Sequence, residues 1–566
     1  MTQSLSLDPY AFPLSRYGSY LIVSSTWGKG PSWGMENGWT LRWIRDNDNS
    51  FIAMIHILEN GERVEVQAER ELATLKFTTP SGAWAEFVPS GDQGLRIRTQ
   101  GCALEIATIT GSYSYAYALS EQYIELIAAA AMPRIGVTAL SGDLHLENIW
   151  ESDDTKEAQC SSISITSQKG NHEYFFQLFD DRPQSQHPAT ESFEEDTQII
   201  EKDFEQWASA FKKFGQSKEY NRSIYTLWLN SISAYREYPS DIILGSKNWM
   251  QRIWSWDHCF NALALAEAHP KLAWEQFILM KNMQGPSGML CDTLTPWGRT
   301  WTCTKNPIHG WTFKMMRQKM KLSKGQLEEA YSTLKSLSTF WTEYRSFDET
   351  GLPYIVYPNE SFDNTTHTAT EAPCIAPDIC TYVILLLDEL SELAEILGLD
   401  ADSKSYLQQS KNLLERMIQY LWNGKKFLSL RLGDHYSPDG DSIFNKIPLL
   451  LGRRLPEPII HSLLNDLMDE SKFWSPWGFR TEAKDSPKYD PDTYVRGRVW
   501  MPPNYFIAEA LSLLGKDDLA IQIKEAFTSC IDHSGPYECF HPETGEGLED
   551  PAYNWTAAAR IFMNPK

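Results

Sequence analysis

The sequence predicts a multidomain chain, an N-terminal antiparallel β-sandwich followed by an all-α (α/α)6 barrel. Up to about residue 180, short segments rich in β-branched residues alternate with turn signals, which is typical of antiparallel sheets. From about residue 220, apolar residues recur with the 3.6-residue period of helices. Long loops with Pro, Gly and aromatic residues separate the helices, and loops of this length in a compact domain are usually functional.

The first 195 residues are predicted to form the β-sandwich. Segments 19–24 and 51–57 are short and rich in β-branched residues, and Asn60-Gly61 is one of the turn signals between such segments. Many short strands at regular spacing favour a sandwich. We expect this domain to brace the barrel. The segment from Trp27 to Met35 is the part that would instead close the rim of a binding pocket, and an apolar face there would equally serve dimerisation.

The period changes after a polar, acidic stretch that begins near residue 183. We expect a linker helix over 196–218 and a barrel that forms the catalytic domain over 219–566. The apolar residues from Ile379 to Leu397 form a broad helical face, which ends at the helix-stop residue Gly398. The helices expected in the barrel region are 220–237, 257–268, 271–283, 324–347, 376–397, 402–421, 456–470, 503–514 and 517–531.

The composition disfavours several classes of protein. With 51 Lys and Arg against 74 Asp and Glu, the formal net charge is −23, which opposes binding to nucleic acid or to an anionic membrane. No window approaches the roughly 18 uninterrupted apolar residues of a transmembrane helix. The nine cysteines include no Cys-x-x-Cys and no zinc-like spacing with His, so we expect neither a metal nor a cofactor. The first residues show no secretory signal, so we expect a cytoplasmic protein with reduced cysteines.

The 21 tryptophans among 566 residues have two explanations. One is a large apolar core, because Trp buries much surface. The other is a carbohydrate site, where flat aromatic faces meet the C–H faces of sugar rings. The placement of nine of them favours the second explanation, because they lie in or beside loops that we assign to one end of the barrel: Trp254, Trp256, Trp297, Trp301, Trp311, Trp474, Trp477, Trp500 and Trp555.

Four of the predicted loops combine acidic and aromatic residues. They cover residues 254–260, 288–311, 357–366 and 535–556. Each has a simpler explanation too: Asp257 as a helix N-cap, His309 as a structural residue at a helix start, and the third and fourth loops as an Asx-type turn and a solvated acidic loop. A glycosidase needs two carboxyls on opposite sides of the scissile bond. Spacing alone cannot select them from 74 acidic residues.

The order of several motifs is similar to that of a known family. The region from about 220 to 562 resembles glycoside hydrolase family 63, above all its mannosylglycerate-hydrolase-like domain. The segments that carry the resemblance are Trp254-Ser-Trp-Asp257-His-Cys-Phe260, Gly288-Met-Leu-Cys-Asp292, Thr304-Lys-Asn-Pro-Ile-His-Gly-Trp311, Phe362-Asp363-Asn364-Thr365, Phe473-Trp-Ser-Pro-Trp-Gly478, Tyr494-Val-Arg-Gly-Arg-Val-Trp500, Tyr537-Glu538, Thr544-Gly545-Glu-Gly547 and Asn554-Trp555-Thr556.

This resemblance implies an inverting, exo-acting α-glycoside hydrolase of α-glucosidase type, without a metal, acting on a small carbohydrate. Asp363 would be the proton donor and Glu538 the general base. An inverting pair would stand about 6.5–9.5 Å apart. The residues implied to bind substrate are Trp254, Trp256, Asp257, Lys305, His309, Trp311, Glu360, Asn364, Arg496, Trp500 and Trp555.

The sequence departs from the family pattern near the acid. Glu360-Ser361 runs directly into Phe362-Asp363, one residue short of the usual motif, so Glu360 is the alternative acid. Asn306 and Arg498 replace prolines of the pattern, which leaves the sugar open. Another (α/α)6 glycosidase, an α-mannosidase, trehalase or α-L-rhamnosidase, is the alternative activity, and an inactive sugar-binding protein is the alternative class. The oligomeric state stays open.

Overall fold

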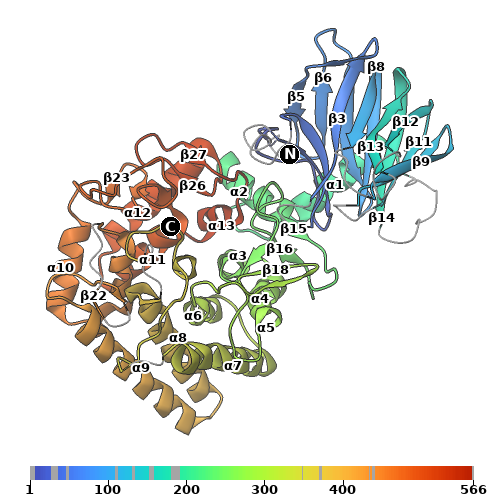
Figure 1. Cartoon of the computed structure of the whole chain (residues 1–566). Helices are drawn as coiled ribbons and strands as arrows, with labels where there is room; N and C mark the ends of the chain where they lie inside the picture. Colours follow the sequence, from blue (N-terminus) through green and yellow to red (C-terminus); the bar gives the residue numbers. More distant parts are fainter. Residues whose placement is uncertain are drawn as a thin grey trace. The chain divides into compact units, whose positions relative to one another are not determined.

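The computed structural model describes residues 5, 7–26, 36–45, 50–108, 113–129, 134–151, 159–179, 191–346, 349–368, 373–431, 434–435 and 440–563. The chain forms two compact units, Met1–Ala234 with Ser246–Arg252, and Tyr235–Gly245 with Ile253–Lys566 (Figure 1). The segment from Trp27 to Met35, predicted to close a pocket rim, lies outside the described residues.

The first unit is built on antiparallel strands, as expected. Its main path of paired strands follows the order β1-β2-β3-β8-β14-β11-β10-β9, and further strands branch from it. The strands are β1 (Leu21–Ser25), β2 (Trp39–Trp43), β3 (Phe51–Glu59), β4 (Glu62–Val64), β5 (Gln67–Arg70), β6 (Leu75–Thr78), β7 (Trp84–Ser90), β8 (Gly94–Thr108), β9 (Tyr115–Ser120), β10 (Tyr123–Ile127), β11 (Arg134–Ala139), β12 (Leu144–Glu151), β13 (Gln159–Ser167) and β14 (Gly170–Phe179).

The long strand β8 joins two groups of strands. Its first half pairs with β7 and β14, and its second half pairs with β3 and β13. Gly101 lies between the two halves with φ 76°, a left-handed conformation that glycine adopts without steric cost. The side chains of Ile97 and Leu104, one on each half, are buried in the core.

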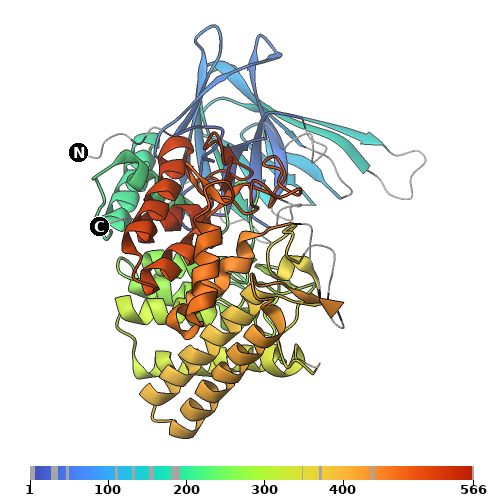
Figure 2. The ribbon, with the colours of Figure 1, turned by 90° about the vertical axis from the view of Figure 1, so that its left-hand side faces the viewer.

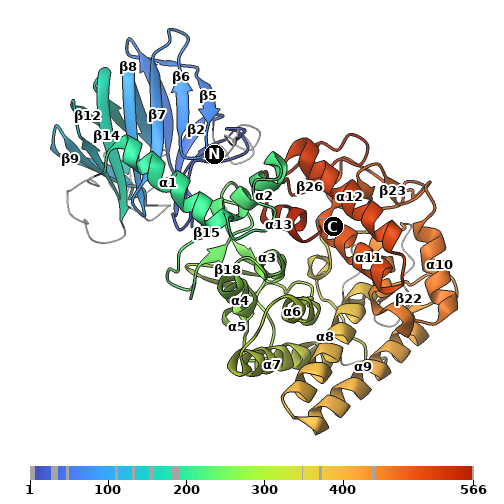
Figure 3. The same ribbon diagram turned by 180° about the vertical axis from the view of Figure 1, so that it is seen from behind.

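Two helices complete the first unit. Helix α1 (Phe193–Ala208) begins with a capping box between Ser192 and Glu195, and it packs against β7 (Figure 3). Helix α2 (Lys218–Leu229) contacts α1. Both helices belong to the first compact unit, so that unit extends beyond the expected domain limits at 195 and 218. Those limits remain a prediction about domain organisation.

The second unit is helical, as expected from the change of period. Its helices are α3 (Asp257–Leu265), α4 (Pro270–Ile278), α5 (Met280–Met283), α6 (His309–Lys319), α7 (Lys324–Thr339), α8 (Pro377–Ile396), α9 (Asp400–Leu421), α10 (Glu457–Leu467), α11 (Met501–Leu513), α12 (Asp517–Ser534) and α13 (Asn554–Phe562), with a 3-10 helix, η4 (Ile443–Arg454). In the described part of the chain, no helix is both long and apolar enough to cross a bilayer.

Six of these elements form a closed inner ring. Contacts connect α3 to α6, α6 to α8, α8 to η4, η4 to α11, α11 to α13 and α13 back to α3. Helices α4, α9 and α12 follow ring members in the chain and pack on them, as α9 does on α8 (Figure 2). All nine residues of α3 are buried, whereas α9 buries one stripe and exposes the rest. This arrangement is the predicted (α/α)6 barrel.

Three ring members were missing from the helices expected from the sequence. Helix α6 and helix α13 follow directly on aromatic loops, and their short apolar stretches were assigned to those loops. The 3-10 helix η4 contains Pro448 and a Gly452 with φ 56°, both of which interrupt the helical pattern.

The loops before the ring helices carry the candidate site residues. Asp257 and His309 are the first residues of α3 and α6. Asp363 precedes α8, Arg496 precedes α11 and Glu538 precedes α13. Because an outer helix returns the chain between successive ring helices, the ring helices begin at the same end of the barrel. Residues far apart in the sequence are thereby brought to one end.

Candidate active site

Glu538 lies in the segment between α12 and α13 and is almost completely buried, with 2% of its surface exposed. The hydroxyl of Tyr494 donates a hydrogen bond to its Oε1, and the backbone N–H of Asp550 lies 3.5 Å from its Oε2. The indole N–H of Trp555 donates to its backbone carbonyl at 3.2 Å. Burial raises the pKa of Glu538 to about 8, although the hydrogen bond from Tyr494 opposes the shift.

Asp363 lies in the loop between a 3-10 turn (Pro358–Glu360) and α8, and its side chain is half-buried. No hydrogen bond to its carboxyl is found among the residues that the structure describes. Burial raises the pKa of Asp363; the charge of Lys305 opposes this rise and that of Asp292 adds to it. No described group therefore occupies this carboxyl, and burial favours its neutral form.

Tyr494 connects the two carboxyls electrostatically. Burial raises the pKa of its hydroxyl well above the ordinary value, and the charges of Glu538 and Asp363 raise it further. The residue after Tyr494 also contacts the residue after Asp363, because the backbone N–H of Val495 donates to Oδ1 of Asn364 at 2.9 Å. The structure thus brings together two acids that lie on different loops.

Asp257, Lys305 and Asp292 form a second set of ionisable residues in the loops before the ring helices. Asp257 is buried, and the hydroxyl of Tyr553 donates to its Oδ1 at 3.3 Å. Burial raises the pKa of Asp257 to about 7. The Nζ of Lys305 lies 3.5 Å from Oδ1 of Asp292 and donates to a backbone carbonyl at 3.1 Å. Burial lowers the pKa of Lys305, but the neighbouring carboxylates, Asp292 foremost, raise it above its ordinary value overall.

Aromatic rings pack closely around these acids. Trp256 contacts Phe362 and Trp555 at centroid distances of 5.6 and 5.7 Å, and Trp500 contacts the same two rings at 5.2 and 5.8 Å. All four contacts are edge-to-face, and Trp256, Trp500 and Trp555 are each at most 5% exposed. These rings exclude water, which explains the raised pKa values of the acids. Their role as sugar-stacking surfaces remains a prediction.

Glu360, the alternative acid, is held in a buried ion pair. Arg345 binds both of its oxygens, at 2.8 and 2.9 Å. The backbone N–H groups of Val356 and Thr304 also donate to it, at 2.9 and 3.3 Å. No part of Glu360 is exposed. Its oxygens are therefore committed to the loop that precedes Asp363.

Asn364 and Arg496 meet beside the acid. The side-chain oxygen of Asn364 accepts a hydrogen bond from the backbone N–H of Val495 at 2.9 Å, and its carbonyl accepts one from Nε of Arg496 at 2.5 Å. Among the described residues, no acidic side chain pairs with Arg496. Its terminal guanidinium nitrogens thus remain available beside the loop of Asp363.

His309 lies behind the site, in the core. It is fully buried, and its Nε2 lies 3.4 Å from Nε2 of His258, whose Nδ1 faces the carbonyl of Gln276 at 2.9 Å. Burial lowers the pKa of His309 well below its ordinary value and that of His258 to about 4. Of the remaining predicted residues, Trp311 is buried in α6, and Trp254 is half-buried in the short strand β17 (Ile253–Trp254).

The side chains of His258, Cys259 and His309 have the right donor atoms to hold a soft metal ion. These atoms lie within 4.8 Å of one another and are buried. A hydrogen bond between the two neutral imidazoles accounts for the short Nε2–Nε2 distance equally well. We therefore assign no metal to this group.

Two tyrosines of the site were not among the predicted binding residues. Tyr494 begins the motif that ends at Trp500, so its place in the motif was a signal that could have found it. Tyr553 directly precedes α13, and its contact with Asp257 depends on two ends of the unit meeting. No local pattern in the sequence indicates that contact.

Comparison with known proteins places the chain in a family. Residues 250–556 match the model of the mannosylglycerate hydrolase MGH1-like glycoside hydrolase domain. The match covers more than half of the chain, so the chain belongs to this family of glycoside hydrolases. The resemblance expected from the motifs is confirmed, and residues 250–556 form a glycoside hydrolase domain of this family.

Curated relatives share shorter segments with the chain. The mannosylglycerate hydrolase of Rubrobacter radiotolerans is 25% identical over 207 residues, which are 33% of this chain and 43% of the relative. The mannosylglycerate hydrolase of Thermus thermophilus is 32% identical over 77 residues, 14% of this chain and 19% of the relative. The chain thus spans less than half the length of these relatives.

Solved structures support the fold. A family 63 mannosylglycerate hydrolase from Thermus thermophilus, in complex with glucose, aligns with a TM-score of 0.53 and 19% identity, over 61% of this chain and 99% of that one. A bacterial glucoamylase complexed with acarbose aligns with a TM-score of 0.63 and 12% identity, over 100% of this chain and 96% of that one. The second alignment covers both compact units.

Proposed function

We propose that the protein is an inverting, exo-acting α-glycoside hydrolase in which Asp363 is the general acid and Glu538 the general base. The observation that carries this proposal is the position of residues 494 and 495: the hydroxyl of Tyr494 donates to Glu538, and the backbone N–H of Val495 donates to Asn364, the neighbour of Asp363. Two carboxyls in one water-excluding site are the groups that glycoside hydrolysis requires.

In this mechanism Asp363 protonates the glycosidic oxygen as the bond from that oxygen to the anomeric carbon breaks. The bonding electron pair leaves with the oxygen, and the aglycone departs as an alcohol. Glu538 takes a proton from a water molecule, and the water oxygen bonds to the anomeric carbon from the opposite face. One water is consumed, and the configuration at the anomeric carbon is inverted.

The hydrogen bonds support this division of roles. Donors face both oxygens of Glu538, which favours the ionised form that a base needs. Asp363 accepts none among the described residues and is free to meet the substrate oxygen. The pKa of about 8 for Glu538 favours the reverse assignment, because a carboxyl with that pKa holds its proton at neutral pH. The reverse assignment is therefore the second candidate.

Glycosyl fluorides separate the two assignments, because fluoride leaves without being protonated. We expect Asp363→Asn to lose its activity on an alkyl α-glycoside by about 100-fold or more and to keep most of its activity on the matching α-glycosyl fluoride. Glu538→Gln should lose both activities. The opposite pattern would establish Glu538 as the acid.

The substrate we propose is a small α-glycoside with an acidic aglycone, an α-glucoside first and an α-mannoside as the alternative. The terminal guanidinium nitrogens of Arg496, which have no acidic partner among the described residues, support a negatively charged leaving group. The curated relatives are named mannosylglycerate hydrolases. Their name supports glycerate as the aglycone, and it is the reason that mannose is kept as the alternative to glucose. Trehalase and α-L-rhamnosidase activities, and an inactive sugar-binding protein, are further outcomes of the test below.

The test is a panel of α-glucosides, α-mannosides and α-rhamnosides, including the glycerate derivatives and trehalose, with the first released anomer followed by NMR. Release of the β-anomer from an α-glycoside supports inversion. Release of the α-anomer would overturn inversion, and hydrolysis of none of the panel would overturn the proposed activity.

A further inference from the structure

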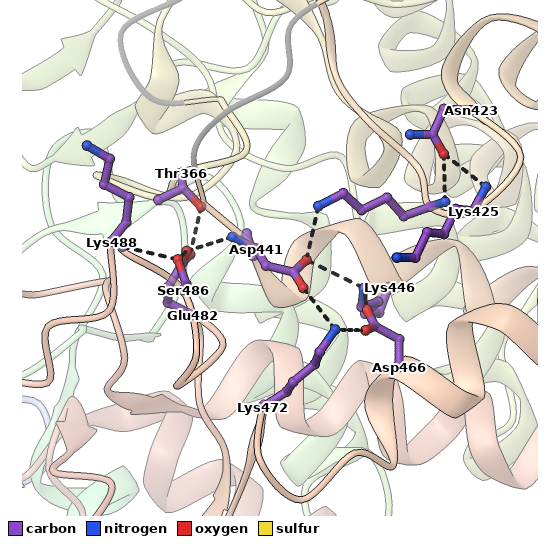
Figure 4. Close-up of polar contacts among 12 residues, drawn as sticks. Thr366, Asn423, Lys425, Asp441, Lys446, Asp466, Lys472, Glu482, Ser486 and Lys488 are labelled. Carbon is purple, nitrogen blue, oxygen red and sulfur yellow. Dashed lines mark hydrogen bonds and ion pairs between the residues drawn. The ribbon is translucent and has the colours of Figure 1, made fainter.

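Glu482 is a buried carboxyl that connects three segments near the proposed acid. It lies four residues beyond the start of the short strand β24 (Gly478–Phe479) and is completely buried. Its oxygens accept hydrogen bonds from the hydroxyl of Thr366 at 2.6 Å, the backbone N–H of Asp441 at 2.7 Å and the hydroxyl of Ser486 at 2.5 Å (Figure 4). Thr366 follows Asp363 by three residues, so Glu482 binds the loop that carries the acid.

No basic side chain pairs with Glu482 in the described part of the chain. The lysines of this region bind its neighbours instead: Lys446 and Lys472 contact Asp441 and Asp466 (Figure 4). A buried carboxyl with only neutral donors is costly, and apolar residues of similar volume often fill such a space without loss of stability. We therefore attribute to Glu482 the positioning of the three donors around it, rather than a gain in stability.

The backbone at Gly440 closes the space around this contact. A Cβ atom at residue 440 would lie 2.5 Å from Cβ of Thr366 and 2.6 Å from Oε1 of Glu482. Next to it, the hydroxyls of Thr365 and Ser442 lie 2.9 Å apart. Ser442 and Glu482 are bridged neighbours, and together they hold residues 365 and 366 through these hydroxyl contacts.

No described group hydrogen-bonds to the Asp363 carboxyl. The direction of this carboxyl therefore depends on the conformation of the loop that carries it. On the basis of the proposed function, we propose that Glu482 is a positioning residue for proton transfer. Acting through Thr366, it fixes the loop so that Asp363 meets the glycosidic oxygen in line with its lone pair. A misplacement of about 1 Å lowers the rate of such a step by about 100-fold.

The test compares two substrates in the full chain. Glu482→Gln replaces one acceptor oxygen by an NH2 group that faces the same donors, and Thr366→Val removes the hydroxyl with little change in shape. For both variants we expect kcat on a methyl α-glycoside to fall by about 10- to 100-fold with KM little changed, while kcat on the matching α-glycosyl fluoride changes by less than about 3-fold. Thr366→Ser, which keeps the hydroxyl, should retain near wild-type rates on both.

The control is Glu389→Gln, which removes a buried carboxyl bound to Arg317 at 2.6 Å and located on α8, away from the acid loop. It should affect the two substrates equally. Equal loss on both substrates in Glu482→Gln and Thr366→Val, or wild-type rates on both, would overturn the positioning role. If the wild-type protein hydrolyses neither substrate, the proposed glycosidase activity fails first, and the positioning role falls with it.

Discussion

The hydroxyl of Tyr494, a half-buried residue, donates a hydrogen bond to Oε1 of Glu538, which is buried. This contact opposes the effect of burial, which favours the protonated carboxyl. The position of this one hydroxyl therefore influences the pH range in which Glu538 can act as a base.

Removal of the hydroxyl should shift the pH profile. In Tyr494→Phe the pKa of Glu538 rises above its value of about 8, because a hydrogen bond to the carboxylate is lost. A base acts when deprotonated, so activity rises as the pH passes through that pKa, and the acidic limb moves to higher pH. At pH 7 we expect kcat/KM to fall about 10-fold or more. Tyr382→Phe, a buried tyrosine of α8, is the control. An unchanged acidic limb in Tyr494→Phe would contradict the prediction.

Neutral replacement of Glu538 should stabilise the fold at alkaline pH. The folded-state pKa of about 8 lies above the ordinary value of 4.5, so the wild-type fold loses stability as the pH rises from about 4.5 to 8. Glu538→Gln has no such loss. We expect its free energy of unfolding to exceed that of wild type by up to about 5 kcal/mol at pH 8 to 9, and the difference to vanish near pH 4. Thermal unfolding at both pH values measures this, and equal differences at the two pH values would refute it.

Arg496→Met should separate acidic from neutral substrates. If its guanidinium binds the aglycone carboxylate, KM should rise by about 10- to 100-fold for α-glucosyl-glycerate, because a charge-assisted hydrogen bond is worth about 1.5–3 kcal/mol. The KM for methyl α-glucoside should change little, and this substrate is the internal control. A parallel change in both KM values would assign Arg496 to the sugar or to the fold.

Glu360→Gln should damage the fold rather than the chemical step. It leaves Arg345 buried without its partner, and breaking a buried ion pair from one side costs about 3–5 kcal/mol. We expect a large drop in melting temperature, while the folded fraction keeps the wild-type ratio of rates on alkyl glycoside and glycosyl fluoride. A selective loss on the alkyl glycoside without loss of stability would restore Glu360 as the acid.

The order of motifs along the chain predicted the family, and the change of period along the chain predicted the two-part fold. These features depend on local signals: alternation in strands, the helical period, and short aromatic and acidic segments such as that from Trp254 to Asp257. The 3-10 helix η4 escaped prediction because Pro448 and Gly452 interrupt its local pattern, although the tertiary contacts with α8 and α11 hold it in the ring.

Only the tertiary structure decided how individual residues are used. Glu360 and Asp363 lie three positions apart in one segment, yet Arg345 binds Glu360, whereas no described group hydrogen-bonds to the Asp363 carboxyl. Tyr494 reaches Glu538 across 44 positions of sequence. The local sequence does not encode these pairings, because they arise when loops before different ring helices meet at one end of the barrel. Burial there, rather than residue type, raises the pKa values of the acids.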